Sequence, residues 1–148
     1  MKLYSHPFSP YGRKVKLVAA MKGLANKVEV LTVDTNKGDP ELNKNNPLSK
    51  IPCLVTDKGE SIFDSHVVGE CLDSVGKGAT LFPASGSDRW KALTLGALGD
   101  GILDAALLMV YEGRFRPADK IVPAWMERQE AKVNQSLDYL ETHLPKWK

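Results

Sequence analysis

The residues best placed to do chemistry in this 148-residue chain lie in the segment 9–12, which reads Ser-Pro-Tyr-Gly. This segment follows a predicted strand over 2–5 and opens a predicted helix that ends near Gly23. The free N–H groups and the positive dipole end of a helix start favour an anionic sulfur, phosphate or carboxylate. The Ser9 hydroxyl could therefore stabilise a bound thiolate, although Ser9 followed by Pro10 is also an ordinary helix cap.

Two further polar motifs occur before and after a predicted β-hairpin. Residues 46–52 read Asn-Pro-Leu-Ser-Lys-Ile-Pro, and Asp64-Ser65 stands at the start of a predicted helix. Taken alone, Asp64-Ser65 reads as a helix cap, and the bond between Ile51 and Pro52 reads as an ordinary trans peptide.

Together the three motifs resemble those of the glutathione transferase family. The segment 9–12 is similar to the Cys-Pro-Tyr-Cys motif of glutaredoxins with Ser9 and Gly12 in place of both cysteines, so dithiol exchange is not expected. Residues 46–52 look like the family's Asn-Pro-x-Gly-Lys-(Ile/Val)-Pro segment, with Ser49 where glycine is usual. Asp64-Ser65 looks like its acidic-Ser pair. The resemblance implies a bacterial-type, serine-containing member.

The resemblance also implies a two-domain fold. We expect a thioredoxin-like α/β domain over 1–80 in the order β-α-β-α-β-β-α, with a mixed four-stranded sheet. An all-helical C-terminal domain over 87–148 is expected to be truncated, because the family continues with further helices whereas this sequence ends at Lys148 with Trp147 unaccounted for.

The site residues follow from the resemblance by position. Ser9 would be catalytic and would activate the thiol of glutathione, and glutathione binding is assigned to Ser9, Lys50, Ile51, Pro52, Asp64 and Ser65. A cis bond before Pro52 would let the Ile51 backbone pair with the ligand. Ser65 would hold the γ-glutamyl carboxylate and Asp64 its ammonium, while Lys50 or Lys37 could reach the glycyl carboxylate.

Other hydroxyls compete with Ser9 for the role of thiol activator. They are Tyr4, Ser5 and Tyr11, and His6 is expected to be exposed or locally bonded. The electrophile pocket is expected near Tyr11, Leu103, Leu107 and Tyr111. The main hypothesis is a transferase that adds the glutathione thiolate to a small hydrophobic electrophile, or does related peroxidase or isomerase chemistry. The alternative is a non-catalytic, glutathione-transferase-like binding or regulatory protein.

The composition limits the classes of partner that we expect for this protein. A hydrophobic content of 43%, a charged content of 26% and a net charge of +2 are typical of an ordinary globular protein and give no sign of nucleic-acid binding. No apolar run approaches the roughly 20 residues of a membrane span, so we expect a cytoplasmic protein. Cys53 and Cys71 lack metal-site spacing and are expected to be buried thiols, so no metal is expected. The family implies a homodimer, with which Phe63 and the long glycine-containing helix are compatible.

The remaining elements are read from periodicity and caps. A strand over 28–34, a helix capped by Asp39 and a hairpin of 53–56 with 61–63 are expected in the first domain. A linker rich in Gly, Pro and Ser spans 76–87. A long helix interrupted by glycines and a second helix beginning near Pro123 follow.

Overall fold

The computed structural model describes residues 1–144; the end of the predicted helical domain, including Trp147, lies outside the described residues. The chain divides into two units, Met1–Ala92 and the segment that begins at Leu93. In order, the elements are β1 (Lys2–Ser5), α1 (Pro10–Met21), β2 (Glu29–Thr32), α2 (Pro40–Asn45), β3 (Cys53–Val55), β4 (Ser61–Ile62), α3 (Ser65–Val75), α4 (Gly86–Phe115) and α5 (Pro123–His143). Two short 3₁₀ turns, Ala25–Lys27 and Ala118–Lys120, complete the list.

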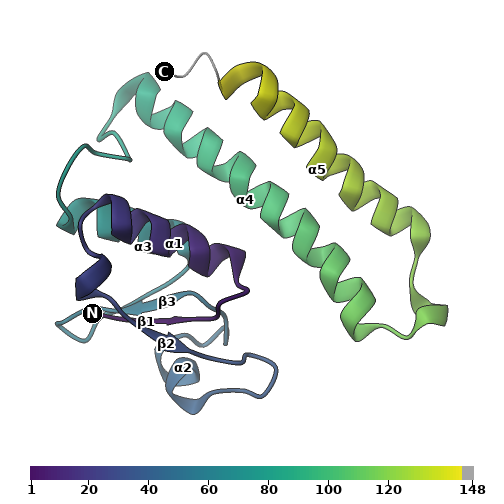
Figure 1. Cartoon of the computed structure of the whole chain (residues 1–148), viewed down its shortest axis with the longest axis horizontal. Coiled ribbons are helices and arrows are strands. Elements are labelled where there is room, and N and C mark those ends of the chain that lie inside the picture. The colour runs from purple at the N-terminus through teal and green to yellow at the C-terminus, as the bar shows by residue number, and fades with distance from the viewer. Residues whose placement is uncertain (145–148) are drawn as a thin grey trace. The chain divides into compact units, whose positions relative to one another are not determined.

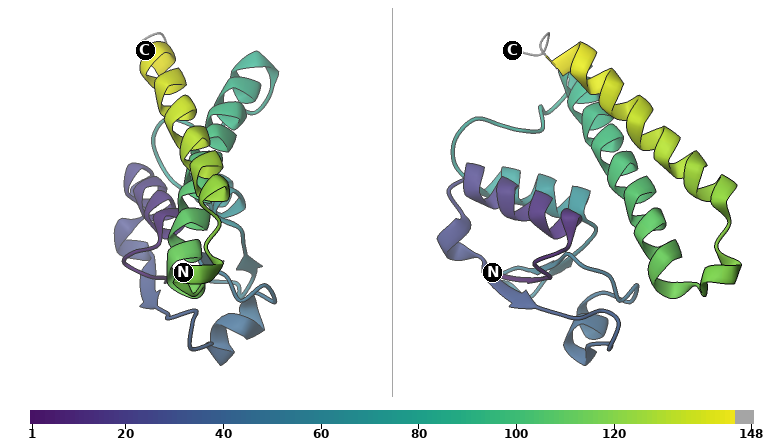
Figure 2. Two further views of the ribbon diagram at one scale, coloured as in Figure 1. Left: turned by 90° about the vertical axis from the view of Figure 1, so that its right-hand side faces the viewer. Right: turned by 45° about the vertical axis from the view of Figure 1, so that its right-hand side comes forward.

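The first unit is built on a mixed four-stranded sheet of order β2-β1-β3-β4. β1 pairs in parallel with β2, and the β1–β3 and β3–β4 pairs are antiparallel. α1 and α3 lie side by side on one face of the sheet and α2 covers the other (Figures 1 and 2). This confirms the predicted element order and the mixed sheet.

Alternation along the strands divides the core into two clusters. Leu3 and Leu54 point to the face covered by α1 and α3, where the cluster comprises Leu3, Val15, Ala19, Leu24, Val28, Leu54, Val68 and Leu72. Tyr4 and Cys53 point to the opposite face and pack with Val33 and Leu42. The sheet is therefore held from both sides, and its edges are where loops can form a site.

One predicted element differs in length from the structure, and the long helix agrees with its prediction. The strand predicted over 28–34 is shorter, Glu29–Thr32, because β2 is an edge strand whose only partner, β1, offers four residues. The predicted long glycine-containing helix is confirmed as one continuous helix, α4, of 30 residues. A methyl group at Gly99 or Gly101 would meet no described atom within 4 Å, so packing within the described part of the chain does not explain these two glycines.

α4 is the element in the described part of the chain that bears on the membrane expectation. It is long and apolar enough to cross a membrane by length and composition, with a mean hydropathy of 1.7 in an 18-residue window. The sequence expectation counted unbroken apolar runs, whereas Asp100 and Asp104 interrupt this one without lowering its mean hydropathy much. The core helix of a soluble protein passes the same test, so this is weak support for a span.

Candidate functional site

Ser9 caps α1 and keeps its hydroxyl proton available. Its backbone is extended, Pro10 occupies the first helical position, and the Ser9 Oγ accepts a hydrogen bond from the Gly12 N–H at 3.1 Å. The Ser9 N–H donates to the His6 carbonyl at 3.0 Å, which closes the turn before the helix. Because a hydroxyl can accept and donate at once, the cap leaves the O–H free to donate to a ligand. The structure therefore confirms that Ser9 is the cap of α1, and this role is compatible with a chemical role.

A close contact between β1 and α1 fixes the position of this helix start. Ser5, at the end of β1, is fully buried, and a Cβ added to Gly12 would lie 2.1 Å from its Oγ. Only glycine at position 12 lets α1 approach β1 so closely. The Ser5 hydroxyl has no hydrogen-bond partner in the described part of the chain.

The hydroxyls that compete with Ser9 have different surroundings. Tyr4 is 8% exposed on the α2 face of the sheet, and burial, followed by the nearby Glu41 and Asp39 charges, raises the pKa of its phenol. Ser5 is buried beneath α1, whereas Tyr11 is half-buried in the first turn of α1. Ser9 and Tyr11 are therefore the hydroxyls with solvent access here. The Nδ1 of His6 accepts from the Phe8 N–H at 3.2 Å, so this imidazole is locally bonded.

The loop before β3 presents the Ile51 backbone. The Ile51–Pro52 bond is cis, as the resemblance implies. Within residues 1–144 the Ile51 N–H and C=O make no backbone hydrogen bond, so both are available to a ligand. Ser49, where the family has glycine, adopts a positive φ of 53°. The left-handed region is the one that favours glycine, which explains the family's preference at this position.

Asn46 braces this loop, a role that the sequence analysis missed. Its side chain is buried; the Nδ2 donates to the Lys50 carbonyl at 2.8 Å and the Oδ1 accepts from the Leu48 N–H at 3.0 Å. An Asn directly before Pro47 is typical of such a side-chain-to-backbone turn, so a signal was present. The brace positions the backbone immediately before Ile51.

The third segment is the start of α3. Asp64 is the N-cap, and its Oδ1 accepts from the His66 N–H at 2.9 Å. Ser65, the first residue of the helix, is 3% exposed, and its hydroxyl makes no hydrogen bond to any described residue. The Phe63–Asp64 peptide bond is cis, which nothing in the sequence indicated. A hydroxyl without a described partner at a helix N-terminus and an exposed carboxylate beside it suit a ligand that carries both a carboxylate and an ammonium.

Strand directions place these three segments at one edge of the sheet. Tyr4 pairs with Cys53 across antiparallel strands, so the end of β1 lies beside the start of β3. Leu54 pairs with Ile62, which places the end of β4 at the same edge. The loops bearing Ser9, Ile51 and Asp64-Ser65 all leave the sheet there.

The lysines are less well defined. Lys50 is exposed beside Ile51. Lys37 is exposed and lies 3.8 Å from the Asp34 carboxylate, a weak surface pair. Hydrogen bonds from Asn36, chiefly from its backbone N–H, hold the pKa of Asp34 below its ordinary value.

The predicted electrophile pocket draws on both units. Tyr11 belongs to the first, whereas Leu103, Leu107 and Tyr111 lie on α4 in the second, so the pocket stays a prediction. A pocket of about 480 Å³ lies elsewhere, at the opposite end of β1, lined by Met1, Lys2, Glu29, Val55, Thr56, Asp57 and Gly59. This pocket is separate from the candidate site, because Ser9 follows the other end of β1.

The cysteines show no sign of reactivity. Cys53 is fully buried and Cys71 is half-buried, and burial raises the pKa of both thiols. Among the described residues, no group of three or more His, Cys, Asp or Glu side chains could hold a metal ion.

Comparison with known proteins identifies the family. Residues 3–77 match the family profile "Glutathione S-transferase, N-terminal domain". The GST-like protein YibF of Escherichia coli K12 is 34% identical over 145 residues, covering 97% of this chain and 70% of YibF. A glutathione transferase family member from Pseudomonas fluorescens Pf-5, solved with bound glutathione, has a TM-score of 0.89 at 39% identity, over 95% of this chain and 70% of that one. A glutathione S-transferase from Methylobacillus flagellatus KT, also with glutathione bound, gives a TM-score of 0.88 at 39% identity, over 98% and 70%. The chain therefore belongs to the glutathione transferase family.

Proposed function

We propose that this protein binds glutathione at the sheet edge formed by Ser9, Ile51 and Ser65 and uses the bound thiolate to attack a small hydrophobic electrophile. The observation that carries the proposal is the Ser9 hydroxyl, which caps α1 through Gly12 and still has a proton to donate. Two solved family members, from Pseudomonas fluorescens and Methylobacillus flagellatus, hold glutathione, which supports the choice of ligand.

The chemistry needed from the protein is to stabilise the thiolate. A thiol has a pKa of about 8.5, so most of it is protonated at neutral pH and a poor nucleophile. A hydrogen bond from Ser9 to the sulfur and the positive end of the α1 dipole both favour the charged form and lower the pKa of the thiol. The thiolate then displaces a leaving group from the electrophile or adds to it, and the proton lost from sulfur passes to solvent.

The remaining contacts would orient the peptide. The free N–H and C=O of Ile51 can pair with the cysteinyl backbone like an added strand. The Ser65 hydroxyl can hold the γ-glutamyl carboxylate and Asp64 its ammonium, while Lys50 is the nearer candidate for the glycyl carboxylate. Assembly as a homodimer, a small hydrophobic co-substrate bound near Tyr11, and a cytoplasmic location stay part of the proposal.

Ser9→Ala and Ser9→Asp test the mechanism together. We expect Ser9→Ala to lower the rate of conjugation to a generic aromatic electrophile by about a hundredfold, as loss of one stabilising donor does at other anionic centres. Ser9→Asp keeps a good cap, so the fold should be retained, but it places a negative charge beside the sulfur and should be at least as inactive. Both variants should still bind glutathione in a calorimetric titration.

The pKa of the bound glutathione thiol distinguishes a catalytic site from one that only binds glutathione. Thiolate absorbance titrated against pH should give a lower pKa with the wild type than with Ser9→Ala. If the wild type binds glutathione without lowering this pKa and without turnover, the non-catalytic binding or regulatory alternative replaces the transferase. If Tyr11→Phe rather than Ser9→Ala raises the pKa, the activating hydroxyl is Tyr11.

A further inference from the structure

The linker between α3 and α4 is hydrogen-bonded almost residue by residue to the ends of α1 and α3, although the sequence predicted only a connecting segment here. The Gly76 N–H donates to the Leu72 carbonyl at 3.0 Å and the Lys77 N–H donates to the Lys22 carbonyl at 2.9 Å. The Lys22 Nζ donates to the Ala79 carbonyl at 2.9 Å and reaches the Gly78 carbonyl at 3.4 Å. Lys22 directly follows α1, so the linker is held against the end of that helix.

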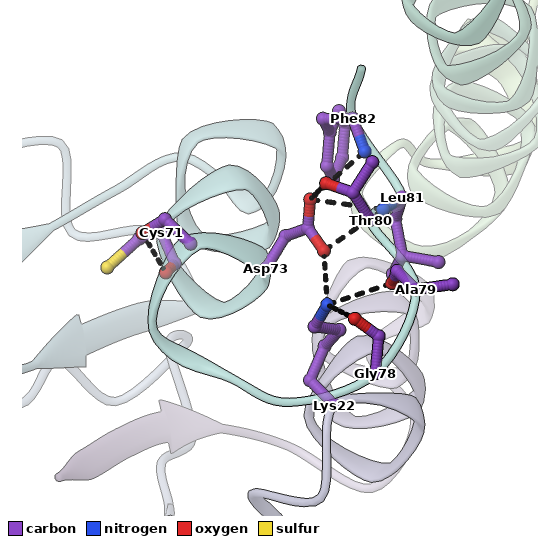
Figure 3. Close-up of polar contacts among 9 residues, drawn as sticks. Lys22, Cys71, Asp73, Gly78, Ala79, Thr80, Leu81 and Phe82 are labelled. Carbon is purple, nitrogen blue, oxygen red and sulfur yellow. Dashed lines mark hydrogen bonds and ion pairs between the residues drawn. The ribbon is translucent and has the colours of Figure 1, made fainter. Parts of the chain in front are cut away.

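A buried carboxylate on α3 binds the next part of the linker (Figure 3). Asp73 forms an ion pair with Lys22 at 2.9 Å, and the two side chains are only 5% and 3% exposed. Asp73 also accepts from the Thr80 hydroxyl at 3.2 Å and from the Leu81 and Phe82 N–H groups, each at 3.0 Å. We call Lys22 and Asp73 the clasp.

The clasp lies at the C-terminal end of α3, where the backbone is closely packed. A Cβ added to Gly76 would lie 2.4 Å from the Lys22 Cβ and 2.9 Å from the carbonyl oxygens of Leu72 and Lys22. A buried ion pair alone is weak support for stability, because desolvation offsets much of the attraction. Apart from Lys22, the described partners of the Asp73 carboxylate are Thr80, Leu81 and Phe82 of the linker, so we expect the carboxylate to fix the conformation of the linker.

The linker held in this way packs against the first turns of α3. The Phe82 ring lies 3.6 Å from where a Gly69 Cβ would stand, and it meets the His66 ring edge-on with 5.6 Å between centroids. His66 directly follows Ser65, and its N–H binds the cap carboxylate of Asp64. Phe82 is therefore the link between the clasp and the helix start that carries Ser65.

A second set of contacts ties the same turns to the start of α4. The His66 Nε2 lies 3.3 Å from the Glu70 carboxylate, which pairs with Arg89 at 3.2 Å. The Arg89 guanidinium also donates to the Pro83 carbonyl at 3.2 Å. The linker is thus fixed at its first end by Lys22 and Asp73 and at its second end by Arg89, which pairs with Glu70 of α3.

We propose that Lys22 and Asp73 are positioning residues, which hold the linker so that Phe82 immobilises the first turn of α3 and with it Ser65. The effect that we expect on glutathione binding rests on the proposed function. The clasp itself can be tested without any ligand. Because an immobile helix start is already ordered, its N–H groups and hydroxyl can bind a carboxylate with a smaller loss of entropy.

Hydrogen exchange combined with glutathione titration tests both parts in the full chain. Asp73→Asn removes the negative charge and replaces one of the two acceptor oxygens with an NH2 donor, which must face either Lys22 or the linker N–H groups. The Leu81 and Phe82 amides should then exchange about tenfold faster or more. The Kd of this variant for glutathione should rise about three- to tenfold, with kcat at saturating glutathione unchanged. The matched control is Asp88→Asn, which removes an exposed ion pair with Lys91 and should change neither quantity.

Phe82→Ala tests the contact between the Phe82 ring and α3 independently of the clasp. It removes the ring but keeps the backbone N–H that Asp73 binds, so exchange at Leu81 should stay slow while the Kd rises as in Asp73→Asn. If Asp73→Asn does not fold, Thr80→Val removes only the hydroxyl donor of an exposed linker residue and should give a smaller shift in the same direction.

Three results would overturn all or part of the proposal. Leu81 and Phe82 amides that stay equally protected in the clasp variants would show that the clasp does not hold the linker. An unchanged Kd in both Asp73→Asn and Phe82→Ala would show that the linker does not position Ser65. A wild type that binds no glutathione would refute the proposed function and the positioning role, while the exchange rates would still decide whether the clasp holds the linker.

Discussion

At the scale of single residues, the Ser9 hydroxyl shows why a structural and a chemical interpretation need not compete. A carbonyl could cap a helix but has no proton to give, and an ammonium could stabilise a thiolate but could not accept from Gly12. Serine does both with one oxygen, and the cap fixes the direction in which the remaining O–H can point. Ser9 is therefore held in position by the hydrogen bond that first suggested a merely structural role.

Gly12 and Ser5 should show strong coupling in a double-mutant cycle. Gly12→Ala places a Cβ against the Ser5 Oγ and should destabilise the fold by about 1–3 kcal/mol, as overpacking does in other cores. Ser5→Ala removes a buried hydroxyl without a described partner and should be neutral or slightly stabilising. The double variant should recover most of the loss, because the clashing atom is gone and alanine favours the helix. Chemical denaturation measures each step, and additive effects would contradict the contact.

Asp73 should make stability depend on acid pH. Burial opposes ionisation, but hydrogen bonds from Lys22, Leu81, Phe82 and Thr80 outweigh it and lower the pKa from 3.8 to about 2. Because the folded pKa is the lower one, the stabilisation is fully present well above pH 4 and is lost as the pH falls toward 2. The difference amounts to about 2 kcal/mol.

Unfolding free energies of the wild type and Asp73→Asn measure this dependence. Their difference should shrink by about 2 kcal/mol between pH 6 and pH 2, with most of the change below pH 5. A difference that stays constant over this range would mean that Asp73 titrates alike in the folded and unfolded chains.

At the scale of elements, the site is a consequence of strand direction. β1 ends where β3 begins and where β4 ends, so three loops distant in sequence leave the sheet at one edge. Two of these loops open helices, α1 and α3, whose N-termini both offer free N–H groups. A tripeptide with a thiolate and a carboxylate can thus meet one helix start with each anion.

Asp64 allows the capping and binding roles of α3 to be measured apart. Asp64→Asn keeps an oxygen for the His66 N–H, so stability should change little, but it loses the charge proposed to bind the γ-glutamyl ammonium. Asp64→Ala loses both and should cost about 1 kcal/mol of stability. Calorimetric titration should give weaker glutathione binding for both variants. Binding lost only in Asp64→Ala would assign Asp64 to the cap alone.

At the scale of the whole molecule, the sequence predicts the elements and the mixed sheet, but not the side-chain contacts between distant elements. The Ser9-Pro10 and Asp39-Pro40 helix starts and the hairpin were predictable because caps and turns act over a few residues. The clasp was not, because Lys22 and Asp73 meet only after α1 and α3 pack side by side. The composition of residues 76–87 predicted a linker but not its hydrogen bonds, because composition does not reveal that a buried carboxylate accepts from the linker N–H groups.

Candidate site residues divide in the same way. Ser9, Ile51, Asp64 and Ser65 were predictable as candidates because whole motifs resemble a known family, and the strand register brings their loops to one edge of the sheet. The Ser5–Gly12 contact carried no sequence signal, since small residues are common at any turn. The predicted electrophile pocket depends on α4 and remains a prediction.

Glutathione should act on the first unit as a clamp between segments far apart in sequence. A ligand that binds the folded state alone stabilises it by about 2.7 kcal/mol at a hundred times its Kd. If one molecule contacts α1, Ile51 and α3 together, hydrogen exchange should slow at the amides of Ile51 and Ser65 and in the first turn of α1. These three changes should follow one binding curve, since a single ligand saturates them. Slowing at the start of α1 alone would mean that the thiol site binds without the peptide contacts, and it would leave Ser9 with an anion site but no means of selecting glutathione.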